Sequence, residues 1–126
     1  MQARHKVALV VDDHSSMRIL LSCTVQKAGF IPVCCSSAED AVAAIIVNPS
    51  VIILDYQLGE VDGISLLKKL KSQTVTQAIP IIFVSADGQT STSTAALTAG
   101  ASAFLTKPFS PRQLIGLIRQ VTGSAK

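Results

Sequence analysis

The stretch from Val51 to Leu54 places the tightest constraint on how this chain can fold. It holds four consecutive large apolar residues, three of them β-branched. This pattern is typical of a strand that is buried on both faces of a parallel sheet. Asp55 follows where the apolar run stops. Because ligands of open α/β sheets bind outside the carboxyl ends of the strands, Asp55 lies where chemistry is expected, although alone it fits a turn residue better.

Other segments have the same strand character. They are Val7–Val11, Phe30–Cys35, Ile79–Val84 and Ala103–Leu105. Proline cannot donate a ladder hydrogen bond, so Pro32 favours an edge position for the second strand of the chain.

Apolar residues at helical spacing separate these strands and follow the last one. The first helix is expected to have Ser15 as its N-cap, to end at Gly29, and to bury one apolar face: Met17, Leu20, Leu21, Thr24, Val25 and Ala28. The second helix is expected behind a capping box from Ser36 to Glu39, with its own buried stripe: Ala38, Ala41, Val42, Ile45 and Ile46.

The remaining helices are expected over 64–71, over 90–99 and from Ser110 to Val121. Asp62-Gly63 suits a tight turn before the first of them. Thr90 to Thr94 are five hydroxyl residues in a row, which are weak helix formers, so the first turns there should be loose. Ser110 is an expected N-cap followed by Pro111 at the first helical position.

Strands alternating with helices predict an α/β fold, a doubly wound parallel sheet of five βα units with right-handed crossovers. The flavodoxin-like strand order 2-1-3-4-5 is expected, in which the first and third strands are adjacent. This adjacency would bring Asp12 and Asp13, at the end of the first strand, close to Asp55 at the end of the third.

Length and composition agree with one small domain. The 126 residues are expected to form a single domain over 1–126, with 122–126 as a frayed tail. Hydrophobic content is 48% and aromatic content 4%, which favours an aliphatic core. The net charge of +3 comes from scattered basic residues, so neither nucleic acid nor membrane is an expected partner of this domain. The three cysteines have no metal spacing and are expected to be reduced, as in a cytoplasmic protein.

The polar residues at the strand ends suit one chemistry. Three carboxylates in one pocket repel one another unless a cation joins them, and an all-oxygen, partly solvated site favours Mg²⁺. Lys107 would add a positive charge from the end of the fifth strand, and Ser85 a hydroxyl from the end of the fourth. An aspartate, a divalent metal, an ammonium and a hydroxyl are the components of phosphoryl transfer onto a carboxylate.

The chain resembles a receiver domain of the two-component response regulators over essentially its full length. The motifs that carry the resemblance stand in family order: Val11-Asp12-Asp13, Leu54-Asp55-Tyr56-Gln57, Asp62-Gly63, Val84-Ser85-Ala86 and Phe104-Leu105-Thr106-Lys107-Pro108-Phe109. Together they are far more specific than any one of them alone.

The resemblance implies that Asp55 is the phosphoacceptor, taking a phosphoryl group from a histidine kinase or a phosphotransfer protein. It implies that Asp13 binds Mg²⁺ directly and Asp12 mainly through water. Asp55 and the backbone carbonyl of Gln57 would complete the protein ligands.

The resemblance also assigns a switch. Ser85 would bond the phosphoryl oxygens, Lys107 would pair with Asp55 and then with the phosphate, and the Lys107–Pro108 bond would be cis. Phe104 stands in place of the family's rotating aromatic, and its alternative is a plain core residue. The surface of the fourth helix, fifth strand and fifth helix would then change shape and control a downstream protein partner.

Three nearby residues have weaker expected roles. Gln57 and Asp87 occupy positions that tune hydrolysis of the acyl phosphate in the family. His14 is expected at the surface rather than at the metal, because Mg²⁺ prefers oxygen ligands.

Two alternatives to this signalling role remain open. An aspartate-nucleophile phosphohydrolase shares the Asp, Ser, Lys and Mg²⁺ components, but it carries a second Asp where this chain has Gln57. A receiver-fold binding module that is never phosphorylated would not need the full set of site residues. We expect no enzymatic turnover of an external substrate.

Overall fold

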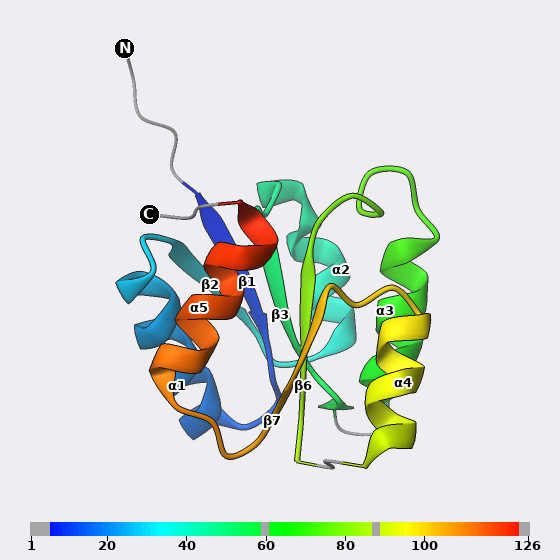
Figure 1. Cartoon of the computed structure of the whole chain (residues 1–126). Coiled ribbons are helices and arrows are strands. Elements are labelled where there is room, and N and C mark those ends of the chain that lie inside the picture. Colours follow the sequence, from blue (N-terminus) through cyan, green and yellow to red (C-terminus); the bar gives the residue numbers. More distant parts are fainter. Residues whose placement is uncertain (1–5, 59–60, 87–88, 124–126) are drawn as a thin grey trace.

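In the computed structural model, residues 6–58, 61–86 and 89–123 are described. One parallel sheet lies at its centre (Figure 1). Its strands are β1 (Val7–Val11), β2 (Ile31–Cys35), β3 (Val51–Asp55), β6 (Ile81–Ser85) and β7 (Ala103–Thr106). They are ordered β2-β1-β3-β6-β7, which is 2-1-3-4-5 for these five strands and confirms the predicted topology. β2, which contains Pro32, lies at an edge as expected.

Helices cover both faces of the sheet. Figure 1 shows α1 (Ser15–Lys27) and α5 (Pro111–Thr122) on one face, and α2 (Ala38–Ala44), α3 (Gly63–Lys71) and α4 (Thr90–Thr98) on the other. Each face has its own apolar cluster. Ile52 and Leu54 of β3 point into the cluster under α2 to α4, while Val51 and Ile53 point into the cluster under α1 and α5. This alternation explains why the central strand is apolar at every position before Asp55.

The N-caps of α1 and α2 each lie one residue away from the predicted position. α1 begins at Ser15 itself, and the cap position belongs to His14, whose backbone N–H donates to Asp12 Oδ1 at 2.8 Å. Ser37, rather than Ser36, caps α2 by accepting a hydrogen bond from the Asp40 backbone. The prediction for α5 is confirmed. Ser110 and Gln113 form a reciprocal capping box before Pro111.

Part of the predicted apolar stripes is exposed. Leu20 on α1 and Val42 on α2 are among the exposed large apolar side chains, as is Ile46, which is 88% exposed. α2 ends at Ala44 and continues as a 3₁₀ turn, η1 (Ile45–Val47), before Asn48 adopts a left-handed conformation. A 3₁₀ turn has fewer residues per turn than an α-helix, so residues at α-helical spacing no longer share one face.

A short hairpin between β3 and α3 was not predicted. β4 (Gln57–Leu58) pairs antiparallel with β5 (Val61–Asp62). The expected Asp62-Gly63 tight turn is wrong, because these residues form the start of α3. The Asp62 side chain accepts a hydrogen bond from the Ser65 backbone at 2.8 Å, and Gly63 is the first helical residue.

Among the described residues, no helix has both the length and the apolar character that crossing a bilayer requires.

Candidate functional site

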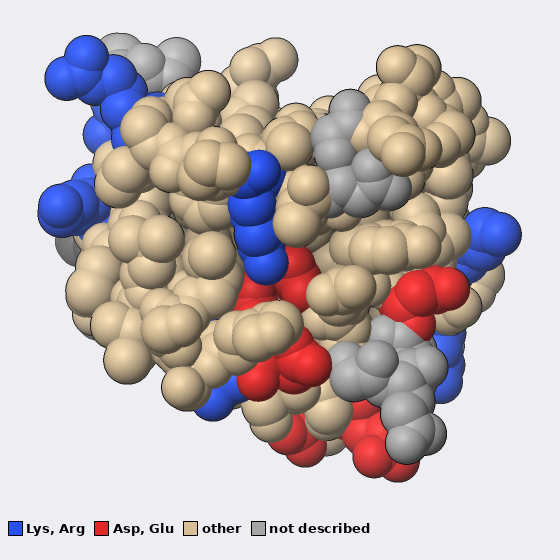
Figure 2. Space-filling model, turned by 90° about the horizontal axis from the view of Figure 1, so that it is seen from below, with Lys and Arg blue, Asp and Glu red and all other residues tan. Residues whose placement is uncertain are grey.

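The carboxyl ends of four strands bring the predicted site residues together. Asp55 and Ser85 are the last residues of β3 and β6, while Asp12 and Lys107 directly follow β1 and β7. Figure 2 looks onto this end of the molecule and shows acidic atoms in a hollow near the middle of the face, crossed by a basic side chain. Asp12, Asp55 and Ser85 are almost fully buried. The site is therefore a pocket at the switch point of the sheet, as the strand order predicts.

Lys107 holds the central ion pair. Its Nζ lies 2.7 Å from Asp55 Oδ1 and 3.6 Å from Asp12 Oδ2. The second oxygen of Asp55, Oδ2, accepts a hydrogen bond from the Gln57 backbone N–H at 3.2 Å. These two contacts fix the orientation of the Asp55 carboxylate, with one oxygen toward β7 and the other toward β4.

The acidic doublet lies within reach of Asp55. One ligand atom from each of Asp12, Asp13, His14 and Asp55 lies within 4.8 Å of the others. The expected meeting of Asp12, Asp13 and Asp55 is thereby confirmed. Within the described ranges, Asp12 Oδ2 is buried and accepts no hydrogen bond. A buried carboxylate oxygen is costly to leave unsatisfied, and a hard divalent cation bound by oxygens would satisfy it. The donor set thus fits Mg²⁺.

Burial raises the pKa of Asp55 above its ordinary value. The hydrogen bond from Lys107 acts in the opposite direction and lowers this pKa, while the negative charge of Asp12 raises it further. Removal of the carboxylate from water is the largest of these effects. A second cation beside Asp55 would therefore favour its ionised, nucleophilic form.

Gly63 and Arg18 support the site in ways that sequence reasoning missed. A Cβ at Gly63 would lie 2.3 Å from the Asp55 carbonyl oxygen, so the start of α3 packs directly on the end of β3. Only glycine permits such a close backbone approach. Arg18 Nη1 donates to the Asp12 carbonyl at 2.8 Å and anchors the doublet from α1. The Asp-Gly pair was the available signal for the first contact, but a turn explained it equally well.

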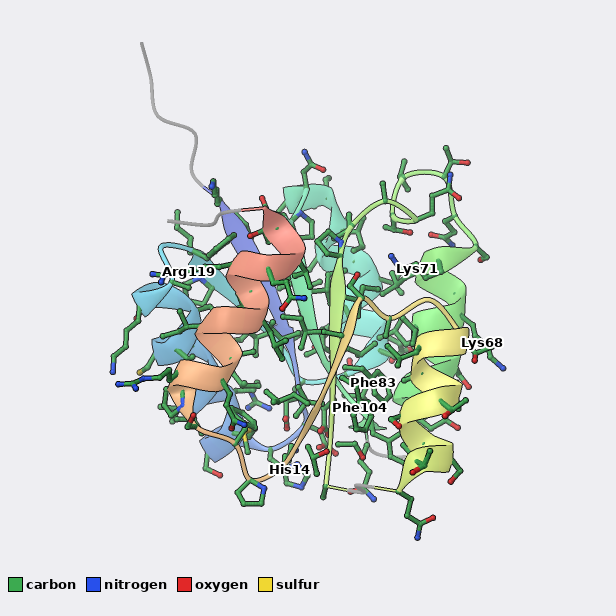
Figure 3. All side chains as sticks on the ribbon, viewed as in Figure 1. His14, Lys68, Lys71, Phe83, Phe104 and Arg119 are labelled. Carbon is green, nitrogen blue, oxygen red and sulfur yellow. The ribbon has the colours of Figure 1, made fainter. Side chains whose placement is uncertain are left out.

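The β6 and β7 ends form the other side of the pocket. The Lys107 backbone N–H donates to the Ser85 carbonyl at 2.8 Å. The Lys107–Pro108 peptide bond is cis, as the resemblance implied. Phe104 stacks on Phe83 with ring centroids 6.1 Å apart, and Figure 3 shows the two rings side by side beneath α4. Phe104 is therefore turned toward the core, where it is partly buried and packs against the apolar cluster under α2 to α4.

His14 is exposed, as expected, and it also lies beside the site. Its side chain is 59% exposed, yet Nδ1 lies 2.9 Å from Asp13 Oδ1 and 3.3 Å from Asp12 Oδ1. Figure 3 shows His14 at the end of the sheet where the strands terminate. The side-chain direction depends on how α1 leaves the sheet, which the sequence pattern did not reveal.

Of the two residues expected to tune hydrolysis of the acyl phosphate, Gln57 is described by the structure and Asp87 is not. Gln57 is exposed and lines the same pocket as Asp55, Ser85 and Lys107. Asp87 lies outside the described residues.

Comparison with known proteins agrees with this geometry. The response regulator receiver domain family matches residues 8–119. The chain is 34% identical over 117 residues to the phosphate regulon transcriptional regulatory protein PhoB of Pseudomonas aeruginosa, covering 92% of this chain and 51% of PhoB. It is 33% identical over 121 residues to chemotaxis protein CheY1 of Helicobacter pylori, covering 92% of this chain and 96% of CheY1.

Solved structures show the same fold. The chemotaxis response regulator CheY4 of Vibrio cholerae superposes with a TM-score of 0.87 at 26% identity, covering 94% of this chain and 99% of CheY4. The chain spans about half the length of the PhoB proteins that it matches. It belongs to the response regulator receiver family, whose members are phosphoacceptor signalling domains.

Proposed function

We propose that Asp55 is the residue that receives the phosphoryl group, from a histidine kinase or a phosphotransfer protein. The observation that carries this assignment is the pairing of the buried Asp55 carboxylate with Lys107 at 2.7 Å, beside a second acidic group within metal-bridging distance. In the transfer, a bond forms between an Asp55 oxygen and phosphorus while the bond from phosphorus to the donor nitrogen breaks. Lys107 stays beside the new acyl phosphate and balances its charge.

Asp13, Asp55 and the Gln57 backbone carbonyl would hold the Mg²⁺ ion directly, and Asp12 would hold it mainly through water. Bound there, Mg²⁺ supplies positive charge that offsets the repulsion between a carboxylate nucleophile and an anionic phosphoryl group. Asp12 Oδ2 supports this use of the pocket, because in the described structure it accepts no hydrogen bond and has the Lys107 ammonium only at 3.6 Å.

The response to phosphorylation starts from the other side of the pocket. Phosphorylation adds nearly two negative charges at Asp55. Ser85 would bond the new oxygens and draw the end of β6 toward Asp55. Phe104, already packed on Phe83, would keep or deepen its inward position as the loop before α4 moves. A changed α4–β7–α5 surface would then bind a downstream protein.

Acyl phosphate formation can be tested directly by mass spectrometry. We expect wild-type protein incubated with acetyl phosphate and Mg²⁺ to gain one phosphoryl group, and Asp55→Asn to gain none. Asp40→Asn, which alters an exposed carboxylate on α2, is the matched control and should label like wild type. Labelling of Asp55→Asn, or no labelling of wild type at saturating Mg²⁺, would contradict the assignment.

The wider context stays predicted: a cytoplasmic location, one domain over 1–126, and no turnover of an external substrate. Gln57 and Asp87 remain predicted modifiers of the hydrolysis rate.

A further inference from the structure

His14 offers a nitrogen atom to a pocket that otherwise offers oxygens. Its backbone is fixed, because its N–H donates to Asp12 Oδ1 at 2.8 Å where α1 begins. Its ring is placed so that Nδ1 lies against one oxygen of each member of the doublet, Asp12 and Asp13. The ring remains 59% exposed, so it can turn slightly without disturbing the core.

The separations fit neighbouring ligands of one ion. In an octahedral shell with bonds of about 2.0–2.1 Å, adjacent ligand atoms are about 2.9 Å apart and opposite ones about 4.2 Å. His14 Nδ1 lies 2.9 Å from Asp13 Oδ1 and 3.3 Å from Asp12 Oδ1, contacts that are an ion pair or hydrogen bond without a metal ion and have the spacing of neighbouring ligands with one. Ligand atoms from all four residues of the group, Asp55 included, lie within 4.8 Å of one another, so the most distant atoms of the group have to approach by roughly 0.6 Å to share one ion.

The charge of the pocket also calls for a divalent ion. Asp12, Asp13 and Asp55 carry three negative charges when ionised, while Lys107 supplies one positive charge. The three carboxylates therefore outnumber the one lysine, and Asp12 Oδ2 accepts no hydrogen bond in the described part of the chain. A divalent cation would neutralise the group and accept the nitrogen lone pair at the same time.

We propose that His14 is a direct nitrogen ligand of the bound cation and makes this site prefer first-row transition metal ions, tested with Mn²⁺, over Mg²⁺. The inference rests on the proposed cation site of Asp12, Asp13 and Asp55. Its physical basis is ligand type. Imidazole is a borderline ligand that binds transition metals well, whereas Mg²⁺ dehydrates reluctantly and prefers oxygen.

The test is pulsed electron paramagnetic resonance of the protein loaded with one equivalent of Mn²⁺, together with calorimetric titrations of Mn²⁺ and Mg²⁺. We expect the wild-type spectrum to show coupling to a directly bound nitrogen, and His14→Gln to lose it. His5→Gln, which alters the only other histidine of the chain, should keep it. His14→Gln should weaken Mn²⁺ binding by about tenfold or more. Mutation of a residue that only hydrogen-bonds a metal ligand typically lowers metal affinity by about that factor. Mg²⁺ binding should change little.

The results of these experiments distinguish a failure of the His14 proposal from a failure of the proposed function. Mn²⁺ bound without nitrogen coupling in wild type would overturn the role of His14 and leave the carboxylate site intact. An equal loss of Mn²⁺ and Mg²⁺ affinity in His14→Gln would overturn the preference. Asp13→Asn should lose binding of both Mn²⁺ and Mg²⁺. Unchanged binding in that variant would contradict the proposed cation site and, with it, the role of His14.

Discussion

Helices α3 and α4 have the same length, nine residues, and lie side by side on one face of the sheet, but they are built very differently (Figure 1). α3 follows the strand that carries Asp55, and α4 follows the strand that carries Ser85. α3 has a side-chain cap from Asp62 and buries three leucines, Leu66, Leu67 and Leu70. α4 has no side-chain cap hydrogen bond, begins with five hydroxyl residues and buries only Ala96 among its own residues.

This difference assigns different tasks to the two sides of the pocket. The α3 side holds Asp55, the proposed phosphoacceptor, in place, because Gly63 packs on the Asp55 carbonyl and the leucines anchor the helix in the core. The α4 side has little apolar burial and poor helix formers to oppose movement. In the proposed switch α4 would shift when Ser85 moves, and a helix with that task is expected to come from the less stable part of a fold. Five predictions test this comparison.

Leu67→Ala should have the largest effect. Leu67 is fully buried, and its truncation should lower the free energy of unfolding by about 2–5 kcal/mol. Ala96→Gly, the matched change in α4, should lower it by about 1–2 kcal/mol through helix propensity and one lost methyl group. Urea unfolding curves measure both, and equal losses would contradict the comparison.

Gly63→Ala should strain the junction between β3 and α3. Its new Cβ would meet the Asp55 carbonyl oxygen at 2.3 Å, and relieving that clash should cost about 1–3 kcal/mol of unfolding free energy. It should also weaken Mg²⁺ binding, because Asp55 has to move. Gly116→Ala in α5 is the control. A Cβ there meets nothing within 4 Å, and stability should rise by up to about 1 kcal/mol.

Amide hydrogen exchange should distinguish the two helices in the native state. We expect the amides of α4 to exchange at least about tenfold faster than those of α3. A tenfold difference corresponds to about 1.4 kcal/mol in the free energy of local opening. A beryllium fluoride mimic of the phosphoryl group should slow exchange in α4 and leave α3 unchanged. Slow α4 exchange that does not respond to the mimic would contradict a mobile α4.

Asp62→Ala should remove the cap of α3. The lost hydrogen bond to the Ser65 backbone should lower the free energy of unfolding by about 1 kcal/mol. Asp62→Asn keeps a capping oxygen and should stay close to wild type. Chemical denaturation of the three proteins makes the measurement, and an unaffected alanine variant would show that packing alone fixes this end of α3.

Thr94→Ala should have the smallest effect and the opposite sign. Thr94 is exposed on α4, and alanine is the better helix former, so the free energy of unfolding should rise by about 0.5 kcal/mol. Lys68→Ala on the exposed face of α3 should change little, because lysine is already a good helix former. A thermal unfolding series would measure both, and no gain from Thr94→Ala would mean that the hydroxyl residues do not weaken α4.

The sequence alone determined the order of the strands and which polar residues meet. Apolar runs fix where strands lie, and parallel strands end at one edge, so Asp12, Asp55, Ser85 and Lys107 could be brought together from the pattern of residues. Element boundaries were less certain. The cap of α2 falls on Ser37 and not on the adjacent Ser36, and the cap position of α1 falls on His14, which has no side-chain cap hydrogen bond, because the exact start of a helix depends on the path of the chain.

Only the tertiary structure decided the contacts that depend on three-dimensional approach. The packing of Gly63 on the Asp55 carbonyl, the ring of His14 against the acidic doublet before it, and the 3₁₀ turn that exposes Ile46 all depend on the path of the backbone where one element ends and the next begins. Local patterns encode which face of an element is buried. They do not encode how closely two backbones approach or where an exposed side chain turns, because both depend on the exact backbone path and side-chain rotamers in the packed structure.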